Sequence, residues 1–360
     1  MTRVLQVLGR SAGGIARHVA QVTETLDGTD GFTVDVAGPP GLPFAMPNLK
    51  YPVTIPDGGR GHLEPIRFLM GPLRDDGYDV VHAHGLRAGI DACVAARRVG
   101  VRRLVTIHNL VMGETKGRLA GLYGLAEPAV VRLSDKTLAV SEEIATRLRR
   151  RAGRAGDRIE VLYLGIGETP EVTRPAPEVR AELGLDEASR LIVTVSRLQP
   201  QKNLPVMFEA LRSVNGAVLA IAGQGELEAE LRALVTDMGL VDRVRFLGFR
   251  ADVADLVAAA DVFCLSSVWE GVPLAVQEAI LLGTPVVGTR VGGMPEIVEN
   301  GRTGRLVEPN NHVALSAALR EVLGDAGLAK AYTDAAGVAL RARFSTERML
   351  ARLKELYAGA

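Results

Sequence analysis

Short runs of apolar, β-branched residues alternate with longer stretches of helical periodicity along most of this sequence. The runs have the length of strands, and the stretches between them are long enough to cross from one parallel strand to the next. In the first half of the chain the expected strands are 4–8, 33–37, 80–82, 104–107, 137–140 and 159–162. The helical stretches between them include 15–26, 87–99 and 142–151. This alternation predicts an α/β fold built on a parallel sheet.

The same alternation restarts in the second half, after a break at 169–177 that contains Pro170, Pro175 and Pro177. Strands are expected at 191–195, 217–221, 244–246, 262–265 and 285–288, and helices at 204–214, 227–238, 253–260, 274–282 and 314–323. A length of 360 residues also exceeds what a single core usually holds. We therefore predict two doubly wound, Rossmann-like domains, 1–170 and 171–342, whose strand carboxyl ends face a cleft.

Composition argues against several other classes of protein. Lys plus Arg and Asp plus Glu both number 42, so the formal net charge is zero and nothing indicates a nucleic-acid partner. No apolar run approaches the roughly 20 residues of a membrane-spanning helix. The N-terminal segment enters a strand without the apolar region of a signal peptide. Cys93 and Cys264 have no metal-ligand spacing, so we expect buried thiols in a cytoplasmic protein.

The densest chemical signal is the segment 267–278, which reads SVWEGVPLAVQE. A buried strand is expected to end at Leu265, and a helix to begin near Leu274. The unpaired amides and positive dipole end of that helix suit polar or anionic groups. Glu270 precedes the helix and Glu278 lies inside it, so each carboxylate could accept two vicinal hydroxyls, one pair on a hexose and one on a ribose. The alternative is a pair of ordinary solvated carboxylates.

Basic residues and glycines follow other expected strands. Arg197 and Lys202 come after the first strand of the second half, where a guanidinium and an ammonium could hold a diphosphate. Gly13 and Gly14 come after the first strand of the chain and open a helix, so a phosphate or sugar could approach the backbone. A solvated loop and a tight turn are the respective alternatives. The glycine spacing is not GxGxxG, which argues against an NAD-binding dehydrogenase.

Taken together, these residues resemble the family 4 glycosyltransferases, a group of retaining enzymes with the GT-B fold. The motifs that carry the resemblance are Gly13-Gly14, Thr106-Ile107-His108-Asn109, Arg197 with Lys202, 246–250, Glu270 with Glu278, 292–298 and 301–304. They cover nearly the whole chain in the same order as in that family. The resemblance implies a GT-B arrangement of two Rossmann-like domains and a nucleotide-sugar donor.

The same resemblance assigns roles to individual residues. Arg197 and Lys202 are implied to hold the diphosphate of the donor and to stabilise the leaving nucleotide. Glu278 is implied to accept ribose hydroxyls, and Glu270 hexose hydroxyls. His108 is implied to approach the donor sugar from the first domain. The other implied donor contacts are Gly13 and Gly14 near the phosphates, Gly248, Phe249 and Arg250 beside the nucleobase, and the backbone of Gly271, Val272, Pro273 and Leu274.

The last helix, within 343–360, has one apolar stripe formed by Met349, Leu350, Leu353, Leu356 and Tyr357. The resemblance implies that this helix crosses back and completes the first domain. Without such a partner the stripe would remain exposed at the end of the chain.

The expected chemistry uses neither a metal nor a cofactor other than the donor. Many sugar transferases hold a divalent ion through an Asp-x-Asp motif, and this sequence contains none. Positive charge would come instead from Arg197, Lys202 and helix N-termini. His82 and His84 end a strand and mimic a metal-binding pair. With no third ligand, we expect His82 in the core and His84 near the acceptor.

The sequence defines the substrates only in class. UDP-sugars and GDP-mannose are both compatible, and we expect a UDP-sugar, with a hydroxyl acceptor bound by the loops 38–60 and 111–118. Arginines from Arg147 to Arg158 form a basic cluster, which fits either a solvated helix end or peripheral docking to the inner face of a membrane. The competing functions are a nucleotide-sugar 2-epimerase and a non-catalytic sugar-nucleotide-binding partner subunit. The oligomeric state stays open.

Overall fold

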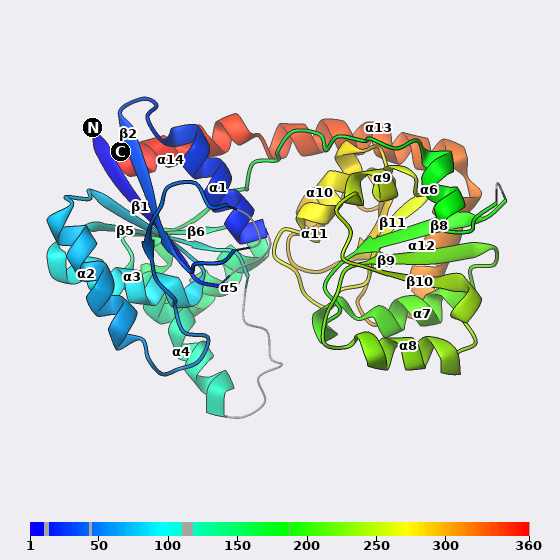
Figure 1. Cartoon of the computed structure of the whole chain (residues 1–360), viewed down its shortest axis with the longest axis horizontal. Coiled ribbons are helices and arrows are strands. Elements are labelled where there is room, and N and C mark those ends of the chain that lie inside the picture. Colours follow the sequence, from blue (N-terminus) through cyan, green and yellow to red (C-terminus); the bar gives the residue numbers. More distant parts are fainter. Residues whose placement is uncertain (11–13, 43–44, 110–117, 187, 360) are drawn as a thin grey trace. The chain divides into compact units, whose positions relative to one another are not determined.

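The computed structural model describes residues 1–10, 14–42, 45–109, 118–186 and 188–359, with the backbone alone for 118–124. The chain forms two compact units (Figure 1). Unit 1 comprises Met1–Gly165 and Phe344–Ala360, and unit 2 comprises Ile166–Arg343.

Unit 1 contains a parallel sheet of seven strands in the order β3-β2-β1-β4-β5-β6-β7. The strands are β1 Thr2–Leu8, β2 Phe32–Gly38, β3 Leu49–Pro52, β4 Val80–His84, β5 Arg102–Ile107, β6 Lys136–Ala139 and β7 Ile159–Val161. The chain order reverses between β1 and β4, which is the Rossmann pattern with one strand added at the edge. Ligands in such sheets bind outside the carboxyl ends of the strands at this reversal.

The helices of unit 1 cover the sheet and include the end of the chain. They are α1 Gly14–Leu26, α2 Leu63–Asp75, α3 Leu86–Val99, α4 Arg118–Leu133, α5 Glu142–Ala152, the 3-10 helix η1 Gly153–Arg158 and α14 Thr346–Ala358. The apolar stripe of α14 is buried against one row of side chains that crosses the sheet, Val4, Val34, Val80, Leu104 and Leu138. In Figure 1 α14 lies next to β1, although the two are separated by almost the whole sequence. The last helix is therefore part of the core of unit 1.

Two residues, Phe344 and Ser345, separate α13 from α14. Phe344 is fully buried against Tyr163, with the ring centroids 5.1 Å apart. Ser345 then caps α14 by accepting a hydrogen bond from the amide of Arg348 at 3.2 Å. A serine in this position satisfies an amide that has no partner within the helix. The local sequence Phe-Ser thus ends one helix and begins the next.

Unit 2 has a parallel sheet of six strands in the order β10-β9-β8-β11-β12-β13. The strands are β8 Arg190–Val195, β9 Ala217–Ala222, β10 Val244–Gly248, β11 Val262–Leu265, β12 Val286–Thr289 and β13 Arg305–Val307. The helices are α6 Ala176–Glu182, α7 Leu204–Arg212, α8 Glu228–Asp237, α9 Val253–Ala258, α10 Leu274–Leu281, α11 Met294–Ile297, α12 His312–Gly324 and α13 Ala326–Arg343, with the 3-10 helices η2 Pro200–Lys202 and η3 Val241–Arg243. Here the order reverses between β8 and β11.

The core of unit 2 joins buried side chains of β8, β9 and β11 to α7 and α12, including Ile192, Leu219, Phe208, Cys264 and Leu319. Both units are thus doubly wound α/β structures on parallel sheets, and the fold class predicted from the sequence is confirmed. The sequence missed the short edge strands β3 and β13.

Candidate active site

The loops after β8 and β11 lie at the reversal of strand order in unit 2. These loops and helix α10, which follows the second of them, carry four of the charged donor residues expected from the sequence. Arg197 follows β8 directly and Lys202 ends η2, whereas Glu270 follows β11 and Glu278 lies within α10. Since the carboxyl ends of neighbouring parallel strands share one edge of a sheet, the two loops meet there. Gln201 ties them together, because its amide nitrogen donates to the carbonyl of Trp269 at 2.9 Å.

Lys202 and Glu270 form an ion pair across these two loops. Nζ of Lys202 lies 2.6 Å from Oε1 of Glu270, and Oγ of Ser267 donates to the same oxygen at 2.5 Å. The side chain of Glu270 is only 6% exposed. A buried carboxylate needs such partners, because an unpaired charge away from water is costly. The pair fixes the ammonium and the carboxylate relative to each other.

Arg197 differs from its neighbour. Its side chain is exposed and makes no hydrogen bond or ion pair with another described residue. A guanidinium that no described carboxylate neutralises, beside a lysine at a strand end, is suited to bind an anion with two oxygens in a fixed plane.

Three glycines support the site loops, and none of them was among the site residues expected from the sequence. A Cβ on Gly223 would lie 1.9 Å from the carbonyl oxygen of Ser196, and one on Gly225 2.3 Å from that of Leu198. On the other loop, a Cβ on Gly292 would lie 1.9 Å from the carbonyl oxygen of Glu270. Glycine is required at these positions because backbone packs directly on backbone.

Helix α10 begins with Leu274 at the end of the Glu270 loop. Gly271 and Pro273 are buried, and Val272 and Leu274 are half-buried. The amides of Val276 and Gln277 in the first turn donate to the carbonyl of Pro273 at 3.1 and 3.4 Å, and the aligned peptide dipoles of the helix add to the positive electrostatic potential of this edge. Glu278 is half-buried within α10. The expected donor contacts between Glu270 and Glu278 therefore lie in one loop and in the helix that follows it.

Several buried polar side chains near these loops have no hydrogen-bond partner within the described part of the chain. They include Thr194, Ser196, Trp269 and both amide atoms of Gln277. Buried polar groups in folded proteins are nearly always paired, so such a group calls for a partner outside the chain. The sequence alone could have pointed to Thr194 and Gln277, because each is a polar residue within an otherwise apolar strand or helix.

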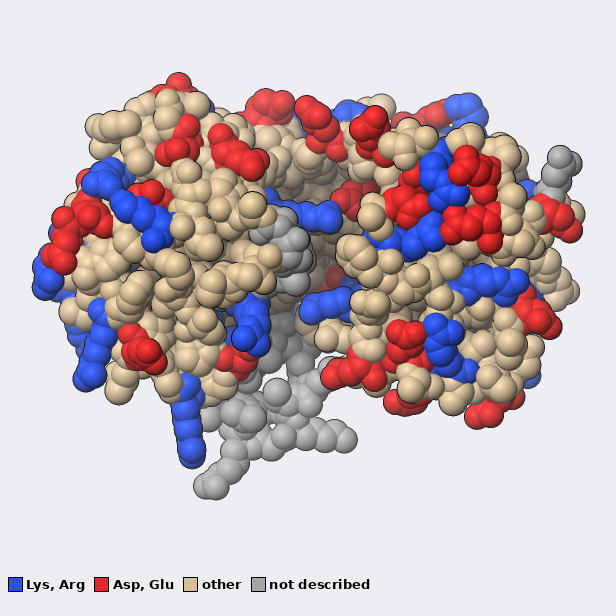
Figure 2. Space-filling view, in the orientation of Figure 1, with Lys and Arg blue, Asp and Glu red and all other residues tan. Residues whose placement is uncertain are grey.

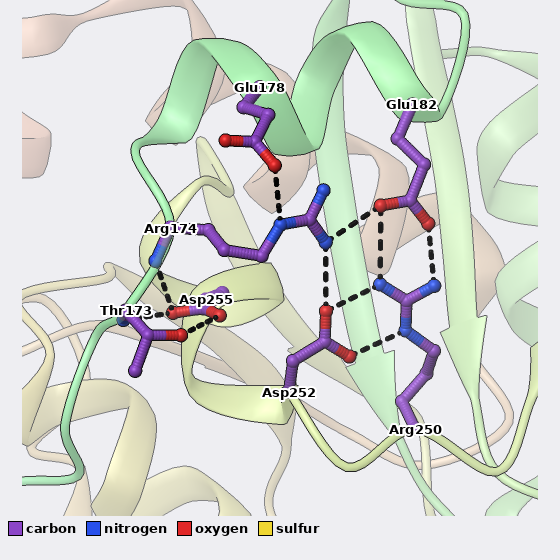
Figure 3. Close-up of polar contacts among 7 residues, drawn as sticks. All are labelled: Thr173, Arg174, Glu178, Glu182, Arg250, Asp252 and Asp255. Carbon is purple, nitrogen blue, oxygen red and sulfur yellow. Dashed lines mark hydrogen bonds and ion pairs between the residues drawn. The ribbon is translucent and has the colours of Figure 1, made fainter.

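The expected nucleobase segment follows β10. Gly248 has φ +66° and Phe249 is 78% exposed, so the backbone turns and leaves an aromatic ring in solvent. The side chain of Arg250 has other partners. It lies 2.6 Å from Oε1 of Glu182 and 2.7 and 2.6 Å from the two oxygens of Asp252 (Figure 3). The Arg250 side chain thus anchors the end of β10 to α6 and to the start of α9.

A second arginine completes this group of charges. NH1 of Arg174 lies 2.8 Å from Glu182 and 3.0 Å from Asp252, so two guanidiniums and two carboxylates alternate (Figure 3). Hydrogen bonds from Arg250 are the main reason why the pKa values of both carboxyls lie below their usual range. Figure 2 shows acidic and basic side chains mixed on this face of unit 2, where Figure 1 places α6 and α9.

In unit 1, Gly14 begins α1 after the first strand, while Gly13 lies outside the described residues. His108 follows β5 and is buried, and its Nε2 lies 3.1 Å from Nδ1 of His84. Burial, and after it the imidazoles of His18 and His82, hold the pKa of His108 well below its usual range. The ring is therefore neutral at physiological pH.

The remaining expectations concern metals, thiols and the basic cluster. His82 and His84 are both buried, and among the described residues no group of three or more His, Cys, Asp or Glu side chains could hold a metal ion. Burial raises the pKa of both cysteine thiols, Cys93 and Cys264, to about 12.

The basic cluster is partly neutralised. Arg147 and Arg151 both pair with the buried carboxylate of Glu127, at 2.9 and 3.1 Å. Arg158 donates to backbone carbonyls of Arg132 and Ser134. In the part of the chain that the structure describes, no helix is long and apolar enough to span a membrane. The acceptor loop expected at 111–118 lies almost wholly outside the described residues.

Comparisons with known proteins agree with this geometry. A family model described as "Glycosyltransferase Family 4" matches residues 12–168, and one described as "Glycosyl transferases group 1" matches 175–337. The chain is 31% identical over 268 residues to the UDP-Gal:alpha-D-GlcNAc-diphosphoundecaprenol alpha-1,3-galactosyltransferase of Escherichia coli, covering 70% of this chain and 68% of that protein. It is 31% identical over 322 residues to a D-inositol 3-phosphate glycosyltransferase of Thermobispora bispora, covering 81% and 74%.

Solved structures show the same fold. The HepE protein of Anabaena in complex with UDP has a TM-score of 0.83 at 22% identity, covering 100% of both chains. WaaG, a glycosyltransferase involved in lipopolysaccharide biosynthesis, has a TM-score of 0.77 at 18% identity over 100% of both chains. The family models, the relatives and the GT-B fold lead to one assignment: this chain belongs to the family 4 glycosyltransferases, enzymes that transfer a sugar from a nucleotide-sugar donor.

Proposed function

We propose that the chain is a retaining, metal-independent hexosyltransferase that uses a UDP-sugar and a hydroxyl acceptor. The observation that carries the proposal is the carboxyl edge of the sheet of unit 2. The guanidinium of Arg197, which has no partner among the described residues, lies there in the same loop as Lys202, and Lys202 pairs with Glu270 of the neighbouring loop. A diphosphate bound there would meet the guanidinium of Arg197, the ammonium of Lys202 and the positive dipole end of α10.

The roles of Arg197 and Lys202 follow from the change of charge during the reaction. As the bond from the sugar to the diphosphate breaks, negative charge on the diphosphate grows, so contacts to it strengthen toward the transition state. Preorganised donors of this kind are worth roughly a hundredfold or more in rate each. This supply of charge, together with the lack of an Asp-x-Asp motif, supports a mechanism without a metal ion. No further cofactor is proposed.

The two glutamates would divide the hydroxyls of the donor. Glu270 is buried and held by Lys202 and Ser267, so it is suited to orient a hexose at the reacting carbon. Glu278 lies within α10 and is assigned to the ribose. In unit 1, the neutral imidazole of His108 is assigned to a hydroxyl of the donor sugar. The proton of the acceptor would pass to a phosphate oxygen of the leaving group, so no protein base is needed.

The names of related proteins support the choice of donor and the range of acceptors. The E. coli relative uses UDP-Gal, and HepE has been solved with UDP-glucose. Acceptors named among the relatives are a diphosphoundecaprenol-linked sugar, D-inositol 3-phosphate and L-malate. For this chain we propose a hydroxyl acceptor of that range. Contact of the basic cluster with a membrane stays a prediction. Two exposed arginines of the cluster, Arg150 and Arg154, have no hydrogen-bond or ion-pair partner among the described residues.

A thermal-shift screen with UDP, GDP, UDP-sugars and GDP-mannose in excess EDTA tests the donor assignment. A ligand at 100 times its dissociation constant should stabilise the protein by about 2.7 kcal/mol. We expect UDP and UDP-sugars to bind without metal. Stabilisation that needs Mg²⁺ or Mn²⁺, or that occurs only with GDP compounds, would contradict the proposal. Transfer with inversion of the anomeric carbon would contradict the retaining mechanism.

Hydrolysis of the donor by water, measured without acceptor, separates a transferase from a binding subunit. Arg197→Lys should lower this rate at least about tenfold, or ~1.4 kcal/mol, because the bidentate geometry is lost although the charge remains. Arg320→Lys makes the same change at an exposed position of α12 and should have no effect.

Glu278→Ala should weaken binding of UDP, whereas Glu270→Ala should lower turnover while UDP still binds. Equal loss of UDP affinity in the two glutamate variants would refute this division. Release of free UDP together with a 2-epimerised sugar would indicate an epimerase.

A further inference from the structure

A buried network of polar side chains connects His108 to the last helix. Nε2 of His108 lies 3.1 Å from Nδ1 of His84, and Nε2 of His84 lies 2.7 Å from Oε1 of Gln6. Nε2 of Gln6 donates to the hydroxyl of Tyr357 at 3.0 Å. Gln6 lies in β1, His84 ends β4, His108 follows β5 and Tyr357 lies in α14. The network therefore connects three neighbouring strands of the sheet of unit 1 with the last helix.

The network continues from Tyr357 to two more buried groups. The Tyr357 hydroxyl lies 2.7 Å from Nδ1 of His82, and Nε2 of His82 lies 2.7 Å from Oγ1 of Thr106. Burial holds the pKa of His82 at about 3 and those of His84 and His108 well below the usual range. Each imidazole is therefore neutral, with one nitrogen that donates and one that accepts.

The orientation of Gln6 determines which nitrogen donates in each ring. Its carbonyl oxygen can only accept, so Nε2 of His84 carries the proton and Nδ1 of His84 is bare. The bare Nδ1 accepts from Nε2 of His108, which leaves Nδ1 of His108 without a proton. On the other side, Tyr357 accepts from Gln6 and so donates to Nδ1 of His82. All the bonds then run in one direction, from His108 toward Thr106.

We propose that Gln6, His84 and Tyr357 are positioning residues that hold His108 in the tautomer with its proton on Nε2, so that Nδ1 of His108 is always a hydrogen-bond acceptor. The inference rests on the proposed function in one respect: Nδ1 of His108 would accept a hydrogen bond from a hydroxyl of the donor sugar. A ring with the proton on Nδ1 would instead present a donor to that hydroxyl.

The opposite tautomer is disfavoured because every bond in the network would have to reverse. A proton on Nδ1 of His84 would place its bare Nε2 2.7 Å from the carbonyl oxygen of Gln6, where two acceptors repel. The side-chain amide of Gln6 would then have to turn over, and its oxygen would accept the hydrogen bond that the Tyr357 hydroxyl now donates to His82. An imidazole nitrogen is more basic than an amide oxygen, so the phenol hydroxyl is better paired with His82 in the present direction.

The nitrogen spectrum of the unliganded protein tests the tautomer directly. In protein labelled with ¹⁵N-histidine, two-bond ¹H–¹⁵N correlations distinguish a protonated ring nitrogen from a bare one, and the His108 signals are identified by their loss in His108→Asn. We expect a protonated Nε2 and a bare Nδ1 on His108. A proton on Nδ1 would overturn the proposal. The tautomer is read from the unaltered protein without substrate, and the His108→Asn variant serves only to assign the signals.

Two substitutions at Gln6 separate positioning from packing. Gln6→Met fills the same volume without an acceptor, and should lower donor hydrolysis roughly tenfold, the value of one buried hydrogen bond. Gln6→Glu keeps an oxygen that accepts from His84 in either protonation state, and should retain at least threefold more turnover than Gln6→Met. A packing role predicts the reverse order, because a buried carboxyl packs less well than a thioether. Equal turnover of the two variants would overturn the proposal.

Further variants keep the test decisive where a Gln6 variant does not fold. Tyr357→Phe removes the hydroxyl that fixes the Gln6 amide, and should give His108 signals from both tautomers. Tyr332→Phe removes a hydroxyl from a buried tyrosine of unit 2 and should change neither the spectrum nor the turnover. UDP affinity should stay within twofold in all these variants. His108→Asn with unchanged turnover, alongside the expected tautomer, would refute the assigned role of His108 and leave the network itself supported.

Discussion

The substitution Gly292→Ala should damage the site without touching any charged group. Gly292 has φ +54°, and a Cβ at this position would lie 1.9 Å from the carbonyl oxygen of Glu270. The next residue, Gly293, donates its amide to the carbonyl of Gly271 at 2.7 Å. These two contacts fix the position of the Glu270 loop relative to the segment that follows β12. A methyl group therefore has to displace that loop.

The size of the effect follows from these distances. Atoms in van der Waals contact are about 3.5 Å apart, so the loop must move by roughly 1.5 Å. Glu270 moves with it and loses its contact with Lys202, which is 2.6 Å long in the intact site. A displacement of about 1 Å at reacting groups can cost around a hundredfold in rate. We expect donor hydrolysis to fall by about that factor.

Gly283→Ala is the matched control. Gly283 has φ +76° and follows α10, but nothing lies within 4 Å of a Cβ placed on it. Both variants therefore bear the left-handed strain of about 1–2 kcal/mol in stability. Only Gly292→Ala should lose turnover, and only Gly292→Ala should alter the emission of Trp269, the single tryptophan of the chain and the neighbour of Glu270. Equal turnover and emission in the two alanine variants would refute the argument that Gly292 positions Glu270.

Three further predictions concern stability. Burial lowers the pKa of His18 to about 4, below its value in the unfolded chain. As the pH falls from about 6.5 toward 4, the unfolded state therefore binds more protons than the folded state. Unit 1 should lose stability over this range, by up to about 1.4 kcal/mol per pH unit from this group. Urea midpoints at pH 7 and pH 5 should differ less in His18→Leu. Leu353→Ala should destabilise unit 1 by about 2–5 kcal/mol, because Leu353 is fully buried in its core. Leu63→Ala, at a leucine that is 69% exposed, should cost under about 0.5 kcal/mol, and calorimetry of the two variants compares their stabilities. Asp255→Ala should destabilise unit 2 by about 2–4 kcal/mol, seen in Trp269 fluorescence during unfolding, because the carboxylate accepts hydrogen bonds from Thr173 and Arg174 (Figure 3).

The long buried strands could be read from the sequence, and the short edge strands could not. A run such as Val4–Leu8 is apolar enough to be recognised alone, because a central parallel strand is buried on both faces. Strand β3, Leu49–Pro52, alternates between half-buried and exposed residues and ends in proline. Strand β13 has three residues. Only pairing with a neighbouring strand identifies such segments, and that pairing is not local in the sequence.

The charged residues of the site could be predicted by type and by position after a strand, whereas their partners could not. The Lys202–Glu270 pair joins residues 68 positions apart, and the bond from Gln6 to Tyr357 joins residues 351 apart. Sequence reasoning placed His82 in the core, but gave no indication that it belongs to one network with His108. Such pairings depend on strand order, which a single sequence specifies only weakly.

Arg250 shows how a motif residue can serve a site without being aimed at a ligand. The resemblance to the family implied that Arg250 lies beside a nucleobase, and in the structure its guanidinium donates to Glu182 and Asp252. Because Asp252 precedes α9 and Glu182 ends α6, the arginine fixes the segment that leaves β10. Phe249, the residue before it, stays exposed. An arginine maintains this geometry better than a lysine would, because its planar guanidinium donates to two carboxylates at once. If unit 2 binds a nucleobase at this segment, the contribution of Arg250 is to hold the backbone of Gly248 and Phe249 in place.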